Sequence, residues 1–363
     1  MPQPDALARE IILEIRLTVI AAAEHRYRVE LRLHLGDGTG EQSLGHNFEL
    51  QLEPQLELSH NGYLHGEALS RQLFQDAAFR AAWHLGVKEA SGERQLHLQL
   101  SLLGAPALQL WPWESLIEPA NGSTPIALAL SPRYLFSRWV DGIELTGFAP
   151  SPPPNPLRVL AVLAQPFKLS NQQRGMPDAA ELASAIRAAL PQAEICFLGN
   201  NVPDSYGPAS LQAIGAQLSG EHAYHVLCLV CNGVSEAGKT LLSLESEAGK
   251  PASEPGTELV KLLKSRSKPL LALLGVCHSG GSAYSGDLHS AVGPELAANG
   301  VGAVVSMLGT VSVEAMGVFI PTLLRTLAAD GRIDHAVLKG RLAIERLQSR
   351  EQRVELEDWF RPI

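Results

Sequence analysis

Short apolar runs separated by amphipathic segments constrain the fold of this chain more than any other feature. In the second half of the sequence, the runs Leu157–Leu163, Tyr224–Cys231 and Leu270–Cys277 are apolar at nearly every position. Strands of this composition are buried on both faces, which is typical of a parallel sheet covered by helices. Segments with apolar residues at helical spacing lie between the runs, for example at Asp178–Leu190 and Thr257–Lys264. The pattern predicts an α/β fold, with a parallel sheet sandwiched by helices.

A proline-rich segment divides the chain into two parts with different patterns. Residues 148–156 read FAPSPPPNP, and five prolines in so short a stretch favour an extended linker. Before the linker, Tyr27–Leu35 alternates apolar and polar residues, which is typical of antiparallel strands with one buried face. The helical spacing of Gly66–Leu85 predicts a helix there. We expect a smaller, mostly β domain with one or two helices at residues 1–147, and the α/β domain at residues 157–363.

Charge and composition exclude several classes of protein. The net charge of −9 gives no basic field for a general nucleic-acid binder. The N-terminus lacks the basic and apolar regions of a signal peptide. The longest weakly polar stretch, Gly300–Leu324, is interrupted by Glu314, so we expect no membrane span. Four cysteines are too few for a disulfide framework and favour reduced thiols, hence a cytoplasmic protein.

Cys277 stands where an apolar strand is expected to end. It opens the glycine-rich bend CHSGGSAYSG at residues 277–286. A nucleophile at such a place is exposed, and backbone N–H groups nearby can hold an oxyanion. A half-buried structural cysteine is an equally good interpretation of the position alone.

The motifs around these strand ends resemble, in order, those of the CHAT domain, a caspase-like cysteine-peptidase family. Members typically have an apolar strand ending in His-Gly, a Leu-x-Leu hairpin, an apolar strand ending in Cys-x-Ser/Thr-Gly, and a GxxAVV strand. The corresponding segments here are Tyr224–Gly233, LLSLE at 241–245, LLALLGVCHSGG at 270–281 and NGVGAVVSML at 299–308. Other likenesses are LWPWESLIEP at 110–119, SPRYLFSRWV at 131–140 and a closing Trp-x-x-Pro segment at 359–362. The ordered set covers nearly the whole chain.

The resemblance implies a catalytic site with one departure from the family pattern. Cys277 matches the nucleophile, and Gly233 matches the glycine whose N–H helps to form the oxyanion hole. Asn232 stands at the position of the catalytic His. A histidine would take the thiol proton and later protonate the leaving amine, whereas an amide does not titrate near neutral pH. His225 is expected at the far end of the same strand, and His278 is expected to point to the opposite face from Cys277.

Two further motifs allow competing interpretations. Gly233–Thr240, GVSEAGKT, matches the P-loop pattern GxxxxGK[ST], which cradles phosphates at a helix start. The following TLLSLE alternates like a hairpin strand, which favours a polar turn over nucleotide binding. Cys228 and Cys231 form a CxxC pair, but within a strand these residues face opposite sides, which favours two core side chains. We expect no cofactor and no metal.

Two functions follow from the resemblance. The first is a cysteine peptidase that cleaves a partner protein and is impaired because Asn232 replaces the base. The second is a pseudoprotease, an interaction or sensor module that keeps the fold and the peptide cleft. An engineered, inactivated variant also fits Asn232. In either case the family implies bacterial signalling or antiphage defence, with the chain as part of a longer or multi-protein system.

Overall fold

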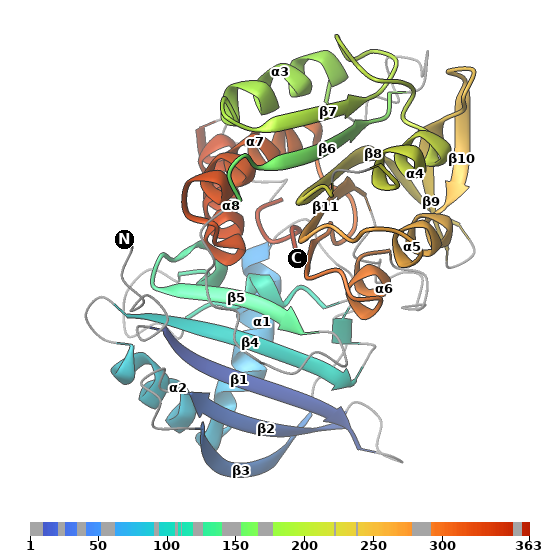
Figure 1. Cartoon of the computed structure of the whole chain (residues 1–363). Coiled ribbons are helices and arrows are strands. Elements are labelled where there is room, and N and C mark those ends of the chain that lie inside the picture. Colours follow the sequence, from blue (N-terminus) through green and yellow to red (C-terminus); the bar gives the residue numbers. More distant parts are fainter. Residues whose placement is uncertain are drawn as a thin grey trace. The chain divides into compact units, whose positions relative to one another are not determined.

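The computed structural model describes most of the chain with gaps. The described residues are 10–20, 26–34, 41–51, 62–90, 94–105, 108–109, 111–118, 126–139, 154–165, 177–220, 223–236, 239–277, 292–350 and 358–363. They form two compact units (Figure 1). The first unit contains residues 1–151 and 348–360, and the second contains residues 152–347 and 361–363. The division falls at Ser151 and Pro152, inside the proline-rich segment.

The first unit is built on a five-stranded mixed sheet with the order β3-β2-β1-β4-β5. Its strands β1, β2 and β3 pair antiparallel, but β4 is parallel to β1 and β5 is parallel to β4. The expectation of antiparallel strands is wrong for β4 and β5, because alternation indicates one buried face and says nothing about strand direction. The strand bounds are Glu10–Val19, Arg26–His34, Glu41–Gln51, Gln95–Gly104 and Tyr134–Trp139.

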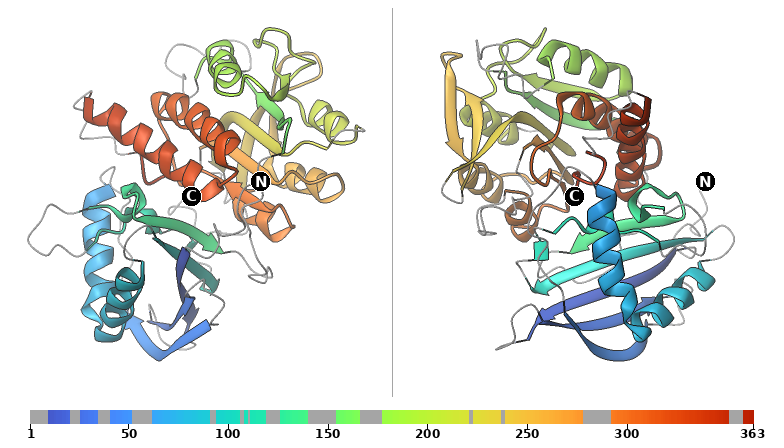
Figure 2. Two further views of the ribbon diagram at one scale, coloured as in Figure 1. Left: turned by 60° about the vertical axis from the view of Figure 1, so that its left-hand side comes forward. Right: turned by 180° about the vertical axis from the view of Figure 1, so that it is seen from behind.

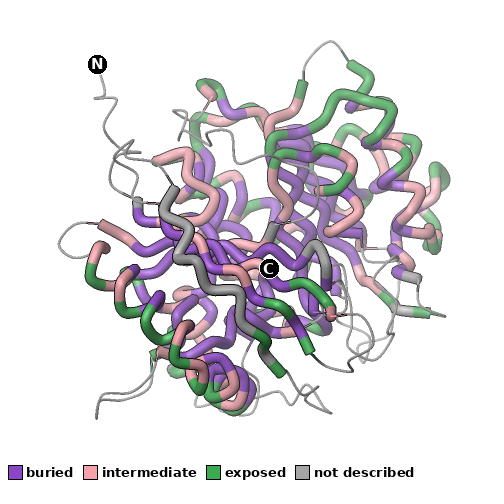
Figure 3. Tube along the Cα trace, turned by 90° about the horizontal axis from the view of Figure 1, so that it is seen from below, coloured by how far each residue is buried: buried purple, intermediate pink, exposed green. Residues whose placement is uncertain are grey.

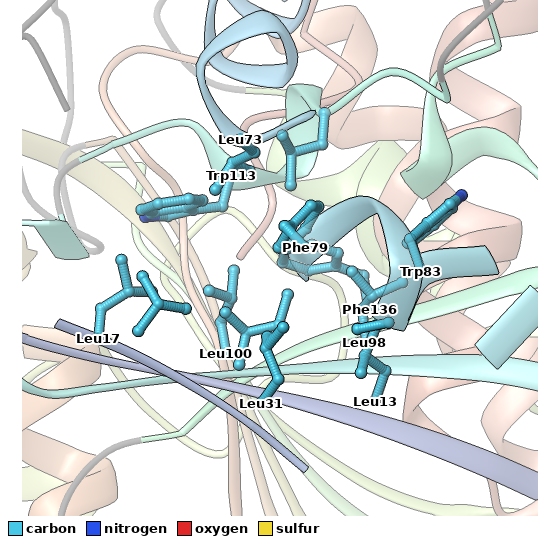
Figure 4. Packing of buried hydrophobic residues seen from close by; sticks show 14 of the residues in the cluster. Leu13, Leu17, Leu31, Leu73, Phe79, Trp83, Leu98, Leu100, Trp113 and Phe136 are labelled. Atoms are coloured by element: carbon cyan, nitrogen blue, oxygen red, sulfur yellow. The ribbon is translucent and has the colours of Figure 1, made fainter. Parts of the chain in front are cut away.

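Two helices cover one face of this sheet. Helix α1 spans Gly62–Gln75 and α2 spans Ala77–Glu89. Leucines from the strands pack against Phe79 and Trp83 of α2 and against Trp113, which lies in the short 3-10 helix η3 (Trp113–Ser115) (Figure 4). A second 3-10 helix, η4, covers Leu128–Leu130. The hydrophobic core of the first unit therefore lies between the sheet and these helices.

The helical stretch predicted over Gly66–Leu85 is two helices, because Asp76 divides it. Asp76 adopts an extended backbone conformation, and its carboxylate accepts a hydrogen bond from the N–H of Phe79 at 2.9 Å. This is an N-cap, which satisfies a backbone donor at the start of α2. The apolar periodicity continues across Asp76, so this one polar residue was the only sequence signal for the end of α1 and the start of α2.

A buried ion pair joins two of the motifs that resemble the CHAT family. The guanidinium of Arg138, in β5, binds both carboxylate oxygens of Glu114, and both side chains are almost completely buried. The same guanidinium donates to the carbonyl oxygens of Gln109 and Trp111. A bidentate pair with additional acceptors fixes the orientation of both partners. The pair therefore explains why Glu114 and Arg138 stand in otherwise apolar surroundings.

The second unit contains a seven-stranded, mostly parallel sheet. Five parallel strands run in the order β7-β6-β8-β11-β12, and the antiparallel strands β9 and β10 continue from β8. All six residues of β11 are buried, as expected for a strand covered on both faces. The bounds are Arg158–Leu163 (β6), Glu194–Leu198 (β7), Val226–Glu236 (β8), Lys239–Glu245 (β9), Pro251–Pro255 (β10), Leu271–Val276 (β11) and Ala303–Val305 (β12).

Helices flank this sheet on both faces (Figure 2). On one side α3 packs against α7, and on the other α5 packs against α4 and α6. Figure 3 shows that the exposed residues lie along helices and turns, whereas the strands are mostly buried. The bounds are Ala179–Ala189 (α3), Leu211–Leu218 (α4), Gly256–Lys264 (α5), Val292–Ala298 (α6), Val313–Asp330 (α7) and Ile333–Arg350 (α8). The fold is thus the α/β arrangement that the apolar runs predicted.

Candidate active site

The candidate site lies at the carboxyl ends of β8 and β11. These strands are parallel neighbours, and their register ends with Cys231 opposite Val276. Asn232 and Cys277 are the next residues on the two strands, so they lie next to each other at one edge of the sheet. β8 also borders β6, where the strand order reverses (Figure 1). Ligands of open α/β sheets bind beside such a reversal, at the carboxyl ends of the strands.

Cys277 lies in a turn directly after β11 and is 8% exposed. Its Sγ donates to the carbonyl oxygen of Val311 at 3.8 Å. Val311 belongs to the connection between β12 and α7, and the next residue, Ser312, caps α7 by accepting from the N–H of Ala315 at 3.2 Å. This connection, residues 306–312, thus places the Val311 carbonyl beside the thiol, a contact that the sequence did not indicate.

Gly233 lies against the backbone of Cys277. A Cβ atom at Gly233 would come within 2.1 Å of the carbonyl oxygen of Cys277 and 2.7 Å of Cγ1 of Val276. Real Cβ atoms do not approach backbone atoms this closely, so a side chain at residue 233 would force the two strand ends apart. The glycine that the family resemblance singled out is therefore required by packing. The same closeness puts the backbone of residue 233 beside the candidate nucleophile.

Beyond Asn232, β8 continues into a hairpin with β9. The antiparallel register runs from Asn232 opposite Ser243 to Glu236 opposite Lys239. A P-loop needs a helix directly after its GK[ST] residues, whose N-terminus holds the phosphates. Here the residues after the glycine-lysine pair form strand β9. The nucleotide-binding interpretation of Gly233–Thr240 is therefore wrong. The residues match the P-loop pattern in sequence, but they do not form the strand–loop–helix structure that binds phosphate.

The cysteines near the site differ in their surroundings. Cys228 and Cys231 are completely buried in β8. Burial raises the pKa of the Cys228 thiol to about 12. Burial also raises the pKa of Cys231, and the nearby Cys277 raises it further, while the backbone N–H of Ser243 acts in the opposite direction. Both thiols are thus core side chains that stay protonated at neutral pH.

His225 lies just before β8, at the end of the strand away from Cys277. Its Nδ1 accepts a hydrogen bond from the backbone N–H of Arg158 at 3.0 Å. Burial lowers the pKa of His225, the Arg158 guanidinium lowers it further, and Glu194 opposes both. The histidine therefore joins β6 to β8 as a neutral acceptor. His278 lies outside the described residues.

A buried carboxylate fixes the rim formed after β7. Glu245, the last residue of β9, is 1% exposed and accepts from the backbone N–H groups of Asn200 at 3.1 Å and Ala209 at 2.8 Å. Gly249 comes so close to Asn200 that a Cβ would meet its amide nitrogen at 2.7 Å. The strand end and the turn after β9 together hold the 199–210 connection. The signal available in the sequence was a glutamate closing an otherwise apolar LLSL run.

The described part of the chain contains no group of three His, Cys, Asp or Glu residues that could hold a metal ion. No helix there combines the length and apolar character that crossing a bilayer requires.

The fold and the residues at its strand ends define the class of protein: it has a caspase-like peptidase fold, preceded in the sequence by a small unit with a mixed sheet. The chain matches the CHAT domain family over residues 65–362. It belongs to this family. A comparison with curated proteins found no match.

Proposed function

We propose that this chain is a caspase-like cysteine-peptidase domain that acts on a partner protein, with Cys277 as nucleophile and with turnover impaired by Asn232. The observation that supports this most is the register of β8 and β11, which brings residues 232 and 277 to one sheet edge. Membership of the CHAT family adds the peptidase-related fold.

Each residue has a distinct part in the proposed chemistry. The thiolate of Cys277 attacks the peptide carbonyl carbon, and the N–H groups of Gly233 and Cys277 stabilise the resulting oxyanion. In a complete dyad, residue 232 would accept the thiol proton and deliver it to the leaving amine. Asn232 does neither, so attack depends on the small fraction of thiolate present at neutral pH, and water supplies the proton to the amine. Turnover is therefore slow.

A pseudoprotease is the second candidate, and the hydrogen bond that the Cys277 thiol donates favours it. Cys277 donates to the carbonyl oxygen of Val311, an acceptor that cannot take the proton. A thiol that keeps its proton in this way is a weak nucleophile, so a bound peptide would not be cleaved. In this alternative the cleft recognises an extended peptide of a partner and signals its presence. The acidic composition and four free cysteines support a cytoplasmic partner that is a protein and not a nucleic acid.

A library of peptide acyloxymethyl ketones, read by intact mass, tests both candidates. We expect a covalent adduct whose rate depends on the peptide sequence and which disappears in Cys277→Ala but persists in the control Cys228→Ala. Slow hydrolysis of matching fluorogenic peptides, absent in Cys277→Ala, would support the peptidase. Saturable peptide binding without hydrolysis would support the pseudoprotease. Adduct rates that are independent of peptide sequence would contradict a peptide cleft.

A further inference from the structure

The last residues of the chain pair with the connection that leads from β12 to Val311. Residues 361–363 pair antiparallel with residues 306–308, which follow β12 (the end is marked C in Figure 1). The N–H and the carbonyl of Ser306 both bond to Ile363 at 2.8 Å, and the N–H of Leu308 bonds to the carbonyl of Arg361 at 2.8 Å. We call residues 361–363 the terminal strand.

Two buried arginines fasten the terminal strand. Arg341, in α8, donates from Nε at 3.2 Å and Nη2 at 2.7 Å to the carbonyl oxygen of Pro362. Arg361 donates from Nη1 to the carbonyl oxygen of Leu308 at 3.2 Å. The next residue, Gly309, has φ +70°, and a Cβ there would meet Nη1 of Arg361 at 2.9 Å. Hydrogen bonds from charged donors to carbonyls are among the stronger ones, so the path of residues 306–309 is well determined.

The fastened segment leads directly to the thiol. Two residues after Gly309, the carbonyl oxygen of Val311 accepts the hydrogen of Cys277 Sγ. Ser312 then caps α7, which fixes the far end of the segment. A carbonyl can accept a hydrogen bond from a thiol but can only repel a thiolate, so this contact favours the protonated, unreactive form of Cys277.

We propose that the terminal strand is a positioning element that restrains the nucleophile: by fixing residues 306–311, it holds the Val311 carbonyl against Cys277 and keeps the thiol protonated. Release of the strand lets the carbonyl move away, and the thiolate fraction rises. Arg341 is the positioning residue of this arrangement because its two hydrogen bonds end on Pro362, remote from the reacting atoms. That the restraint controls peptidase activity rests on the proposed function. The effect of the restraint on the protonation of Cys277 does not.

Other titratable groups lie on the described elements around Cys277. These are the thiol of Cys231 on β8, the carboxylate of Glu314 in the first turn of α7, and Glu245 on β9. The substitutions used in the test leave all three groups in place. The test therefore compares the titration of Cys277 with the strand fastened and with it loosened, with the same titratable neighbours present in both cases.

The test is the rate of iodoacetamide alkylation of Cys277 as a function of pH in Arg341→Met, which keeps the apolar stem and removes both hydrogen bonds to Pro362. We expect a two- to fivefold faster reaction at neutral pH, about the factor for one lost thiol hydrogen bond, and a lower pH midpoint. Arg341→Lys, which keeps one donor, should restore part of the restraint. Arg346→Met, exposed on the same helix, is the matched control and should behave like the unmodified protein.

The other three cysteines separate restraint from unfolding. Cys196, Cys228 and Cys231 are buried, so general loosening would speed the alkylation of all four thiols without lowering the midpoint of Cys277. If Arg341→Met behaves in that way, Ile363→Pro is the deciding variant, since it removes only the N–H that bonds to Ser306. An unchanged rate and midpoint in the folded variants would overturn the proposal. This test uses no peptide, so its outcome does not depend on the proposed function. The peptide probes can fail while the restraint is confirmed, and the restraint can fail while the peptide probes react.

Discussion

The two ends of β8 present opposite combinations of the groups that a cysteine peptidase needs. At the amino end, His225 is held between strands, and its Nδ1 accepts the backbone N–H of Arg158. At the carboxyl end, Cys277 lies beside Asn232, on the neighbouring strand. One end has an imidazole without a thiol, and the other has a thiol whose neighbour cannot titrate. The difference shows that a histidine beside the right strand cannot serve as the base when it stands at the amino end, away from the thiol.

The largest effect is expected for the close approach at the carboxyl end. Gly233→Ala places a Cβ on the backbone of Cys277, where neither strand can move without breaking the pairing of β8 and β11. We expect the free energy of unfolding to fall by about 3 kcal/mol, the upper range for overpacking in a core. Urea denaturation followed by circular dichroism measures it.

Gly207→Ala is the matched control, because a Cβ at Gly207 has no atom within 4 Å. Its effect should stay within about 0.5 kcal/mol, as for other surface substitutions. Equal stabilities of the two variants would show that the strand ends are not as close as described.

The next effect concerns the base that is missing at the carboxyl end. Asn232→His should raise the alkylation rate of Cys277 at pH 7 by roughly tenfold, because an isolated thiol is only a few per cent ionised there and a neighbouring imidazole can take its proton. Iodoacetamide labelling followed by intact mass measures the rate, and Asn232→His combined with Cys277→Ala is the control. An unchanged rate would mean that residue 232 is not beside the thiol, and the proposed dyad positions would be wrong.

A smaller effect distinguishes the amino end. The pKa of His225 is lowered in the fold, so the unfolded chain binds its proton more readily. The stabilisation from neutral His225 is complete above the unfolded pKa of about 6.5 and is lost as the pH falls through it towards the lower folded pKa. The free energy of unfolding should decrease less between pH 7 and pH 5 in His225→Asn, whose amide oxygen can replace Nδ1 as acceptor. Identical pH slopes would argue that His225 does not act as a neutral acceptor.

No effect at all is expected from the lysine of the β8–β9 hairpin. Lys239→Ala should leave binding of ATP and GTP, measured by calorimetry in the presence of Mg²⁺, as undetectable as in the unmodified protein. Lys239 begins β9 opposite Glu236, and no helix starts there to hold a phosphate. Nucleotide binding that disappears on this substitution would revive the P-loop interpretation.

Much of the second unit could be predicted because its elements are locally encoded. The apolar run at 270–277 became β11, and the helical spacing at Asp178–Leu190 became α3, which Asp178 caps. That the strand ends near Cys231 and Cys277 should be inspected followed from the rule that ligands of parallel sheets bind at the carboxyl ends of the strands. The choice of Asn232 and Cys277 as site residues was implied by the resemblance to the CHAT family.

The remaining features depend on contacts between residues far apart in the sequence. The mixed direction of the first sheet depends on pairing of β1 with β4, and alternation carries no information on pairing partners. The contact of Val311 with Cys277, and the fastening of residues 306–308 by the terminal strand, use backbone carbonyls and N–H groups. Every residue has these groups, so no residue type marks them in the sequence.

Glu245 has a consequence for how this chain tolerates substitution. Its carboxylate binds the main-chain N–H groups of Asn200 and Ala209 and reads no side chain at either position. Substitutions at exposed positions of this connection, such as Asn200 and Tyr206, therefore leave this anchor intact, provided that Asn200 does not become proline. Gly199 differs, because a Cβ there would meet the carbonyl oxygen of Leu163 at 2.4 Å. A single acidic residue on β9 thus fixes the main chain of the connection while the exposed side chains along it can vary.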